Sequence, residues 1–351
     1  MILRYVKNKE YIDCCINLYV AYGNLKRRIK YKKRRLSMEQ NIIAVIWDFD
    51  KTLIPGYMQD PIFKEYKIDA KKFWDEVNAL PKQYADKDIR VNRDTIYLNH
   101  IITCINQGIF KGLNNKKLRD FGKELEFYPG VPEIFRDMKD IVEKEQKYKT
   151  FSIQVEHYIV STGITEMIKG SKVNDYVDGI WGCEFIEKPI RSNLDIKIDE
   201  MDDSEETLNQ IGYMIDNTSK TRAIFEINKG SNKFKIDVNS KIDRDKRRVP
   251  FTNMIYIADG PSDIPVFSIL KQYGGKTFAI YPKGNTKAFN QVNDLIRDGR
   301  IDMYAEADYQ KDTTAYMWLT ENVKQIAEQI YNLNLKQVFD SAGSVPGHII
   351  E

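Results

Sequence analysis

Two aspartates one residue apart follow an apolar run near position 45. Residues 45–53 read Val-Ile-Trp-Asp48-Phe-Asp50-Lys51-Thr52-Leu53. Because alternate side chains of a β-strand point the same way, we expect Asp48 and Asp50 to face one point just beyond the strand's carboxyl end. Two carboxylates there repel each other unless a cation lies between them or one takes a proton. The pattern indicates a nucleophile paired with an acid/base, although an acidic turn whose Asp caps a helix would give the same short motif.

A second strand-like run, residues 153–163, ends in Ser161, Thr162 and Gly163. A hydroxyl and unblocked backbone N–H groups at a strand-to-helix turn suit a phosphate. Further along, Lys220 opens a segment with helical apolar periodicity. These residue types predict a site for the phosphoryl oxygens.

A third apolar run, residues 254–258, is followed by Asp259, Gly260 and, four residues after Asp259, by Asp263. Glycine lets the backbone bend tightly after a strand. Two carboxylates at such a turn suit a hard cation such as Mg²⁺. The run therefore predicts a buried strand that ends in metal ligands.

These four motifs stand in the order found in the haloacid dehalogenase superfamily, and the chain resembles its phosphoserine-phosphatase-like branch. The resemblance spans roughly residues 42–285. It implies an α/β fold, a Rossmann-like open parallel sheet with helices on both faces. It also implies a mainly helical cap inserted after the first catalytic strand.

The resemblance implies a role for each motif residue. Asp48 would be the nucleophile that becomes an aspartyl-phosphate, and Asp50 would protonate the leaving oxygen and later deprotonate water. The phosphoryl oxygens would be bound by Thr52, Ser161, Thr162, Gly163 and Lys220. Mg²⁺ would be held by Asp48, the backbone carbonyl of Asp50, Asp259 and Asp263. Lys229 and Lys233 remain alternatives to Lys220 as the phosphate-binding lysine.

The implied activity is a Mg²⁺-dependent phosphomonoester hydrolase acting on a small phosphorylated metabolite. Alternatives are a phosphotransferase of the same fold, and a nucleic-acid-associated phosphatase that binds through a basic arm. Phosphoserine phosphatases carry a glutamate nine residues after the nucleophile, where this chain has Tyr57. Asp60 is the nearby carboxylate that could replace it, so phosphoserine is a doubtful substrate.

The chain divides into three expected parts. Residues 1–40 form a basic arm, disordered or dispensable, since Met38 offers an alternative start. Residues 41–53 and 130–351 form the catalytic core, with a β-hairpin or flap around 183–216. Residues 54–129 form the helical cap, with Pro129-Gly130 marking the return to the core.

Bulk properties favour a cytoplasmic enzyme. The 351 residues carry a formal net charge of +3, yet residues 1–37 hold eleven Lys or Arg and two acidic residues, so the body is mildly acidic. The Lys/Arg cluster at 26–35 could contact nucleic acid. Four cysteines without metal spacing indicate a reducing compartment. Of three histidines, His157 is expected as a packed neutral ring, and no apolar run reaches membrane-spanning length.

Overall fold

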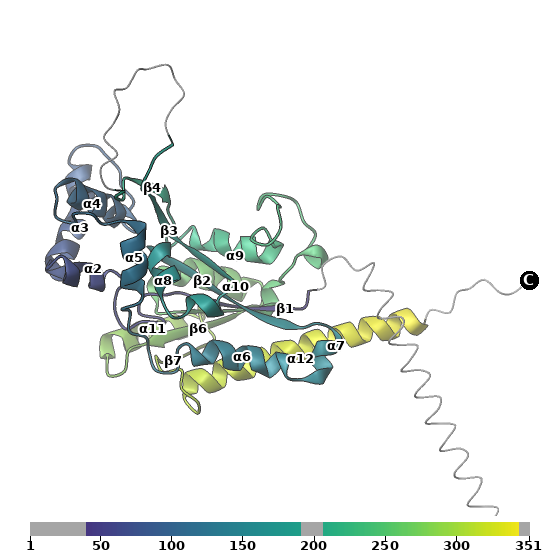
Figure 1. Ribbon diagram of the computed structural model, residues 1–351. Helices are drawn as coiled ribbons and strands as arrows, with labels where there is room; N and C mark the ends of the chain where they lie inside the picture. Colours follow the sequence, from purple (N-terminus) through teal and green to yellow (C-terminus); the bar gives the residue numbers. More distant parts are fainter. Residues whose placement is uncertain (1–39, 191–205, 344–351) are drawn as a thin grey trace, which may run out of the picture.

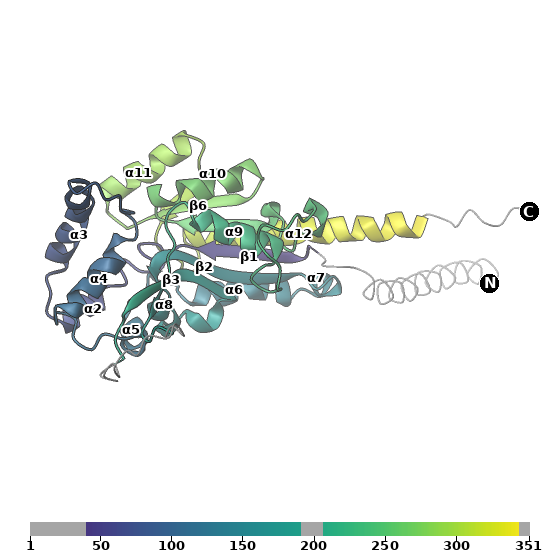
Figure 2. The same cartoon turned by 90° about the horizontal axis from the view of Figure 1, so that it is seen from above.

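The computed structural model describes residues 40–190 and 206–343, and within them the chain forms a seven-stranded sheet (Figures 1 and 2). The strand order is β4-β3-β2-β1-β5-β6-β7. All neighbouring strands run parallel except β3 and β4, which are antiparallel. The strands are β1 (Ile42–Trp47), β2 (Gln154–Ile164), β3 (Gly179–Ile186), β4 (Gln210–Tyr213), β5 (Met254–Ala258), β6 (Lys276–Tyr281) and β7 (Met303–Glu306).

Helices cover both faces of this sheet. On one face α9 (Lys220–Lys229) packs on β2 and α10 (Ile264–Gln272) on β5 and β6. On the other face α6 (Glu133–Glu143) packs on β2 and on α12 (Thr314–Gly343), which also contacts β1 and β7. Shorter or peripheral helices are α7 (Gln146–Thr150), α8 (Thr165–Gly170) and α11 (Thr286–Arg297). The predicted α/β fold, an open and mostly parallel sheet with helices on both faces, is confirmed.

The central strand β1 is apolar because it is covered on both faces. Residues 43–47 are fully buried, as are most of the residues of β5 beside it. Trp47 donates through Nε1 to Nδ1 of His157 (3.2 Å), and the other ring nitrogen of His157 lies 2.9 Å from the carbonyl oxygen of Phe135. Burial, with a smaller effect of Lys139, lowers the pKa of His157 to about 3. The ring is therefore packed and neutral, as expected.

Four helices lie between β1 and α6: α2 (Asp60–Glu65), α3 (Ala70–Ala85), α4 (Ile96–Asn106) and α5 (Asn115–Gly122). Asp69 caps α3 and Asn114 caps α5 through side-chain oxygens that accept backbone N–H groups. Aromatic rings hold α2, α3 and α4 together, with Phe63 4.7 Å from Phe73 and Trp74 5.8 Å from Tyr97. Figure 1 shows this layer beyond the carboxyl ends of the parallel strands.

The region expected to hold a hairpin contains β3 and β4, which pair with Glu184 opposite Tyr213. The acidic stretch between them, residues 191–205, lies outside the described residues, as does the basic arm at 1–39. Cys104 and Cys183 are buried free thiols. In the described ranges, no helix has the length and apolar character needed to span a membrane.

Candidate active site

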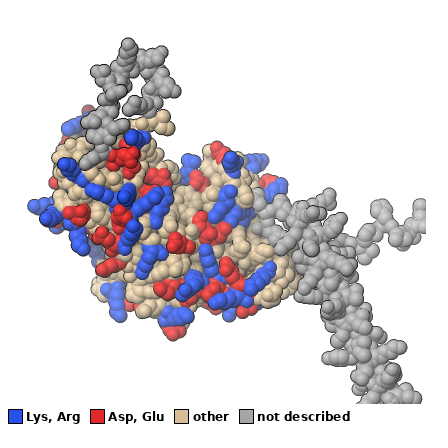
Figure 3. Space-filling model, in the orientation of Figure 1, with Lys and Arg blue, Asp and Glu red and all other residues tan. Residues whose placement is uncertain are grey.

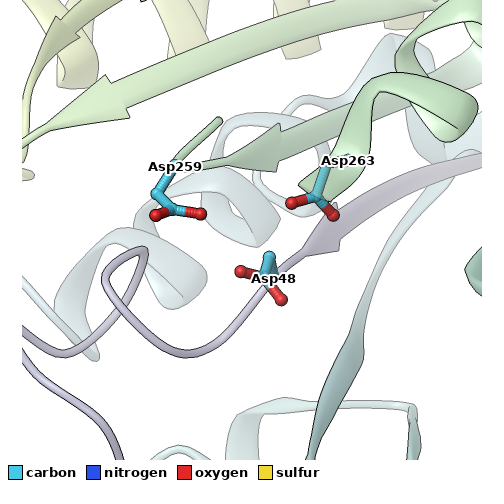
Figure 4. A group of neighbouring side chains, drawn as sticks. All are labelled: Asp48, Asp259 and Asp263. Carbon is cyan, nitrogen blue, oxygen red and sulfur yellow. The ribbon is translucent and has the colours of Figure 1, made fainter. Parts of the chain in front are cut away.

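Three aspartates from two neighbouring strands meet at the carboxyl edge of the sheet. Asp48 follows β1, Asp259 follows β5, and Asp263 ends the turn Pro261–Asp263. The two strands are parallel neighbours, and the N–H of Asp48 donates to the carbonyl of Ile257 (2.8 Å). One oxygen of each carboxylate lies within 4.8 Å of the others. Figure 4 shows the three side chains turned toward one another.

Lys220 brings a positive charge to these carboxylates from the start of α9. Its Nζ lies 2.8 Å from Oδ1 of Asp48 and 2.7 Å from Oδ1 of Asp263, and only 1% of the residue is exposed. Lys229 instead donates to the carbonyls of Val238 and Ser240, and Lys233 to that of Asp178. The structure thus places Lys220, rather than either alternative, at the acidic cluster.

The carboxylates of this site outnumber its ammonium group, and the pKa values of the carboxylates are raised. Burial raises the pKa of Asp48 to about 6 although Lys220 lowers it, and burial together with Asp48 and Asp263 raises that of Asp259 to about 7. Burial and the charge of Asp48 also raise the pKa of Asp50 well above its usual value. Hard oxygen donors with excess negative charge fit a bound divalent cation such as Mg²⁺.

Asp50 lies beside this cluster and is oriented by the chain that follows it. Its Oδ1 accepts the N–H of Met58 (3.0 Å), which leaves the second oxygen outside that hydrogen bond. Its side chain is not among the three clustered carboxylates, and metal binding through its carbonyl stays a prediction. Thr52 donates its hydroxyl to Oδ2 of Asp48 (3.3 Å), so that side chain orients the expected nucleophile directly.

The Ser161 region differs from the open turn that the sequence predicted. Strand β2 continues through Gly163 to Ile164, so the predicted turn comes later in the chain. The N–H of Gly163 donates to Oγ of Ser161 (3.0 Å), and that of Ile164 to Sδ of Met58 (3.0 Å). These amides are therefore engaged within the protein, which corrects the expectation of unblocked N–H groups. Ser161 itself is buried, and its hydroxyl proton is still available for donation.

Thr162 contacts other elements through its backbone. Its carbonyl accepts the hydroxyl of Tyr97 (2.8 Å) from α4 and the thiol of Cys183 (3.3 Å) from β3. Gly163 is needed for packing, because a Cβ there would lie 2.1 Å from Cε of Met58. Thr162 and Gly163 thus contact strands and helices around the site. Ser161 is the residue of this group whose hydroxyl could donate to a ligand.

Three tyrosines near the site carry no sequence motif. Tyr97 bridges α4 to β2, and Tyr256 donates to Oδ1 of Asp263 from within β5. The buried hydroxyl of Tyr128 has no hydrogen-bond partner in the described part of the chain. Burial, then the charge of Asp259, raises the pKa of Tyr128 to about 12. In the sequence these site residues are marked only as tyrosines among apolar residues. Tyrosines of an ordinary core have the same sequence surroundings.

The first loop places Lys51 and Tyr57 next to each other. Nζ of Lys51 lies 2.6 Å from the hydroxyl of Tyr57 and 4.1 Å from the centre of its ring. Burial lowers the pKa of Lys51, but the Tyr57 contact and the charges of Asp259 and Asp50 outweigh burial, so the pKa is raised. Asp60 lines, together with Tyr57, a cavity of about 260 Å³ that is lined also by Lys64, Glu124 and Glu126.

Comparison with known proteins gives one extended sequence match. The chain is 38% identical over 292 residues to an uncharacterized protein from Borreliella burgdorferi, a match that covers 82% of this chain and 99% of the relative. The chain therefore belongs to the same family as that protein. No family model matches the chain.

Among solved structures, similar folds include a HAD family hydrolase from Salmonella enterica serovar Typhi and a phosphoserine phosphatase holding a phospho-aspartyl intermediate analogue. The first is 16% identical with a TM-score of 0.45, covering 76% of this chain and 68% of the other. The second is 15% identical with a TM-score of 0.46, covering 80% and 99%. Likeness of this size assigns no activity. The haloacid dehalogenase-type fold is supported here by the chain's own strand order and by four motifs meeting at one sheet edge.

Proposed function

We propose that the chain is a Mg²⁺-dependent phosphomonoester hydrolase of the haloacid dehalogenase type, acting on a small phosphorylated metabolite through an aspartyl-phosphate. The observation that carries the proposal is the meeting of Asp48, Asp259 and Asp263 with the ammonium of Lys220 at the carboxyl edge of the sheet. Parallel α/β sheets bind their ligands at this edge.

Asp48 is the proposed nucleophile. A carboxylate and a phosphate dianion repel each other, and Mg²⁺ held by Asp48, Asp259, Asp263 and the Asp50 carbonyl would offset that repulsion. Lys220 and Thr52 hold the two oxygens of the Asp48 carboxylate. Lys220 has a third N–H, and Ser161 its hydroxyl proton, to bind oxygens of the transferring group.

Asp50 is the proposed acid/base. Burial and the charge of Asp48 raise the pKa of this carboxyl and so favour its protonated form, which can donate a proton to the leaving oxygen. Once it has lost that proton, the same group can accept one from the water that hydrolyses the aspartyl-phosphate. The Met58 N–H holds one oxygen in place through both steps.

Helices α2–α5 are proposed to act as a cap. Tyr97 binds the carbonyl of Thr162, the side chain of Asn92 donates to Asp216 (2.8 Å), and the N–H of Asn217 donates to Asp94 (3.3 Å). The first bond joins α4 to β2. The other two join the segment before α4 to the chain just before Lys220. A closed cover over the site would exclude water and strengthen its electrostatic interactions.

Nothing in the described residues favours the nucleic-acid alternative. Figure 3 shows positive and negative side chains interspersed over the visible face, without a basic stripe. The cluster at 26–35 lies outside the described residues. Hydrolysis and transfer to an acceptor alcohol share every residue named above, and product analysis with and without added alcohol separates them.

Phosphate release from phenyl phosphate tests the proposal. We expect turnover with Mg²⁺, loss of turnover with EDTA, and loss in Asp48→Asn, because the amide is a poor nucleophile. Asp75→Asn, an exposed aspartate in α3 paired with Lys71, is the matched control and should keep full activity. Equal activity in Asp48→Asn and the parent protein would overturn the proposal.

A further inference from the structure

We propose that Lys51 binds an anionic group on the leaving-group side of the substrate, so that preferred substrates carry a carboxylate or a second phosphate beyond the reacting phosphoryl group. The inference rests on the proposed function and names its substrate class. It starts from the first loop, where Lys51 directly follows Asp50 and is held by Tyr57.

The backbone at Lys51 adopts a conformation that a lysine rarely takes. Its φ is +57°, in the left-handed region that costs a non-glycine residue about 1 kcal/mol or more. The N–H of Lys51 donates to the carbonyl of Gly56 (3.2 Å) and closes the loop. The ammonium then reaches Tyr57, whose ring lies 5.3 Å from that of Trp74 in α3. The backbone of Lys51 is thus fixed by the closed loop, and its ammonium is held by Tyr57.

The Lys51 ammonium feels the charges of Asp259 and Asp50 but is not paired with a carboxylate of the described residues. Among the described residues no carboxylate forms an ion pair with Lys51, whereas Lys220 has two such partners. The Tyr57 hydroxyl is neutral and takes one of the three ammonium N–H groups. The remaining N–H groups of a half-buried cation are available to an anionic ligand, and charge-assisted bonds of this kind are strong.

Lys51 directly follows Asp50, the residue proposed to protonate the leaving group. Asp50 must reach the leaving oxygen, and its carboxyl is tied to the N–H of Met58, the residue after Tyr57. Lys51 directly follows Asp50 and Tyr57 directly precedes Met58, so both lie next to this hydrogen bond along the chain. Phosphoserine phosphatases place a carboxylate at the position of Tyr57 for an amino group. A lysine supported by a tyrosine reverses the sign of the charge that this region attracts.

Three esters test the inference: glycerol 3-phosphate, 3-phosphoglycerate and 1,3-propanediol bisphosphate. The first has a neutral leaving group, the second a carboxylate and the third a second phosphate. We expect the parent protein to have a higher kcat/KM for one or both anionic esters than for glycerol 3-phosphate, and the two arms show which anion is preferred. In Lys51→Met that preference should fall about tenfold or more, the range of one charge-assisted hydrogen bond.

Two further variants make the result specific. Lys51→Arg should keep the preference, because it restores the charge. Lys64→Met removes a neighbouring exposed lysine of α2 and should leave the preference unchanged. Methionine and lysine meet the same backbone cost at φ +57°, so Lys51→Met should fold normally, which a thermal melt checks.

The inference is overturned if Lys51→Met slows all three esters equally, since Lys51 would then only offset the site carboxylates. Binding of the three esters can also be measured in Asp48→Asn and in the double variant Asp48→Asn/Lys51→Met. This comparison does not depend on turnover. Loss of anionic-ester binding there supports the Lys51 role even if hydrolysis fails. Unchanged binding contradicts it whatever the outcome for hydrolysis.

Discussion

Asp50 is a site carboxyl whose environment favours the protonated form. Burial and the nearby charge of Asp48 both disfavour its anionic form. In Asp50→Asn we expect kcat to fall by a factor on the order of 10² to 10⁴. Inhibition by inorganic phosphate should change little, because the proposed phosphate ligands are Lys220 and Ser161.

The loss in Asp50→Asn should depend on the leaving group. Esters of acidic phenols need little help from a general acid, so their rates should fall less than those of alkyl phosphates. Steady-state kinetics over a series of phenyl and alkyl phosphates measures this dependence. Equal losses across the series would show that Asp50 does not protonate the leaving oxygen.

Lys220 is the residue whose removal should affect stability most. Breaking a buried ion pair leaves an uncompensated charge and costs roughly 3–5 kcal/mol. We expect Lys220→Met to lower the free energy of unfolding by that order, measured by urea titration, and Mg²⁺ to restore part of it. Lys229→Met, in the same helix but bonded only to carbonyls, should lose less and gain nothing from Mg²⁺.

Single residues were predictable where a motif sits at a strand end. Asp48, Asp259 and Asp263 come together because β1 and β5 are parallel neighbours whose carboxyl ends align. The amide of Gly163 was not predictable, because its partner is the hydroxyl of Ser161 two residues away in a strand that runs on. Local sequence does not show whether a strand ends at its last apolar residue.

At the scale of elements, α4 connects the helices over the site to the sheet. The hydroxyl of Tyr97 donates to the carbonyl of Thr162 (2.8 Å) in a partly buried hydrogen bond. The sequence predicted a helical segment over residues 54–129, but not which side chain would reach β2. The contact of Tyr97 with β2 depends on how the helices pack, and the spacing of apolar residues does not show that packing.

Tyr97→Phe tests this connection. Losing a buried hydrogen bond should cost about 1 kcal/mol of stability and loosen the contact, so KM should rise more than kcat falls. Tyr66→Phe, which removes an exposed bond to the carbonyl of Lys111, is the control. Urea unfolding and steady-state kinetics measure both. An unchanged KM in Tyr97→Phe would argue against a role of α4 in closing the site.

At the scale of the molecule, the acidic site links stability to pH and metal. The pKa values of Asp48 and Asp259 are raised to about 6 and about 7, so without metal the folded protein binds more protons than the unfolded chain between about pH 4 and 7. The contribution of protonated Asp48 and Asp259 to the free energy of unfolding is therefore present at low pH, and it is lost as the pH rises from about 4 to 7.

Mg²⁺ should reverse that loss by replacing the protons. We expect the increase in Tm on adding Mg²⁺ to be larger at pH 8 than at pH 5, measured by calorimetry. Asp259→Asn should show a smaller increase at pH 8. An increase that is larger at pH 5 would mean that the cation binds elsewhere.

The fold class followed from the order of strand-like runs and motifs along the chain. Contacts between distant segments, such as Tyr309 donating to the carbonyl of Thr52 (2.7 Å), could not be predicted. They depend on the final packing of the whole chain.

The central claim is that phosphorus becomes bonded to the carboxylate of residue 48. Borohydride reduction of the protein quenched during turnover, followed by peptide mass spectrometry, tests it most directly, because borohydride reduces an acyl phosphate to an alcohol and leaves free carboxylates intact. We predict that the reduced site is residue 48 and that it depends on both substrate and Mg²⁺. Reduction at another residue, or turnover with no reducible intermediate at residue 48, would contradict the account.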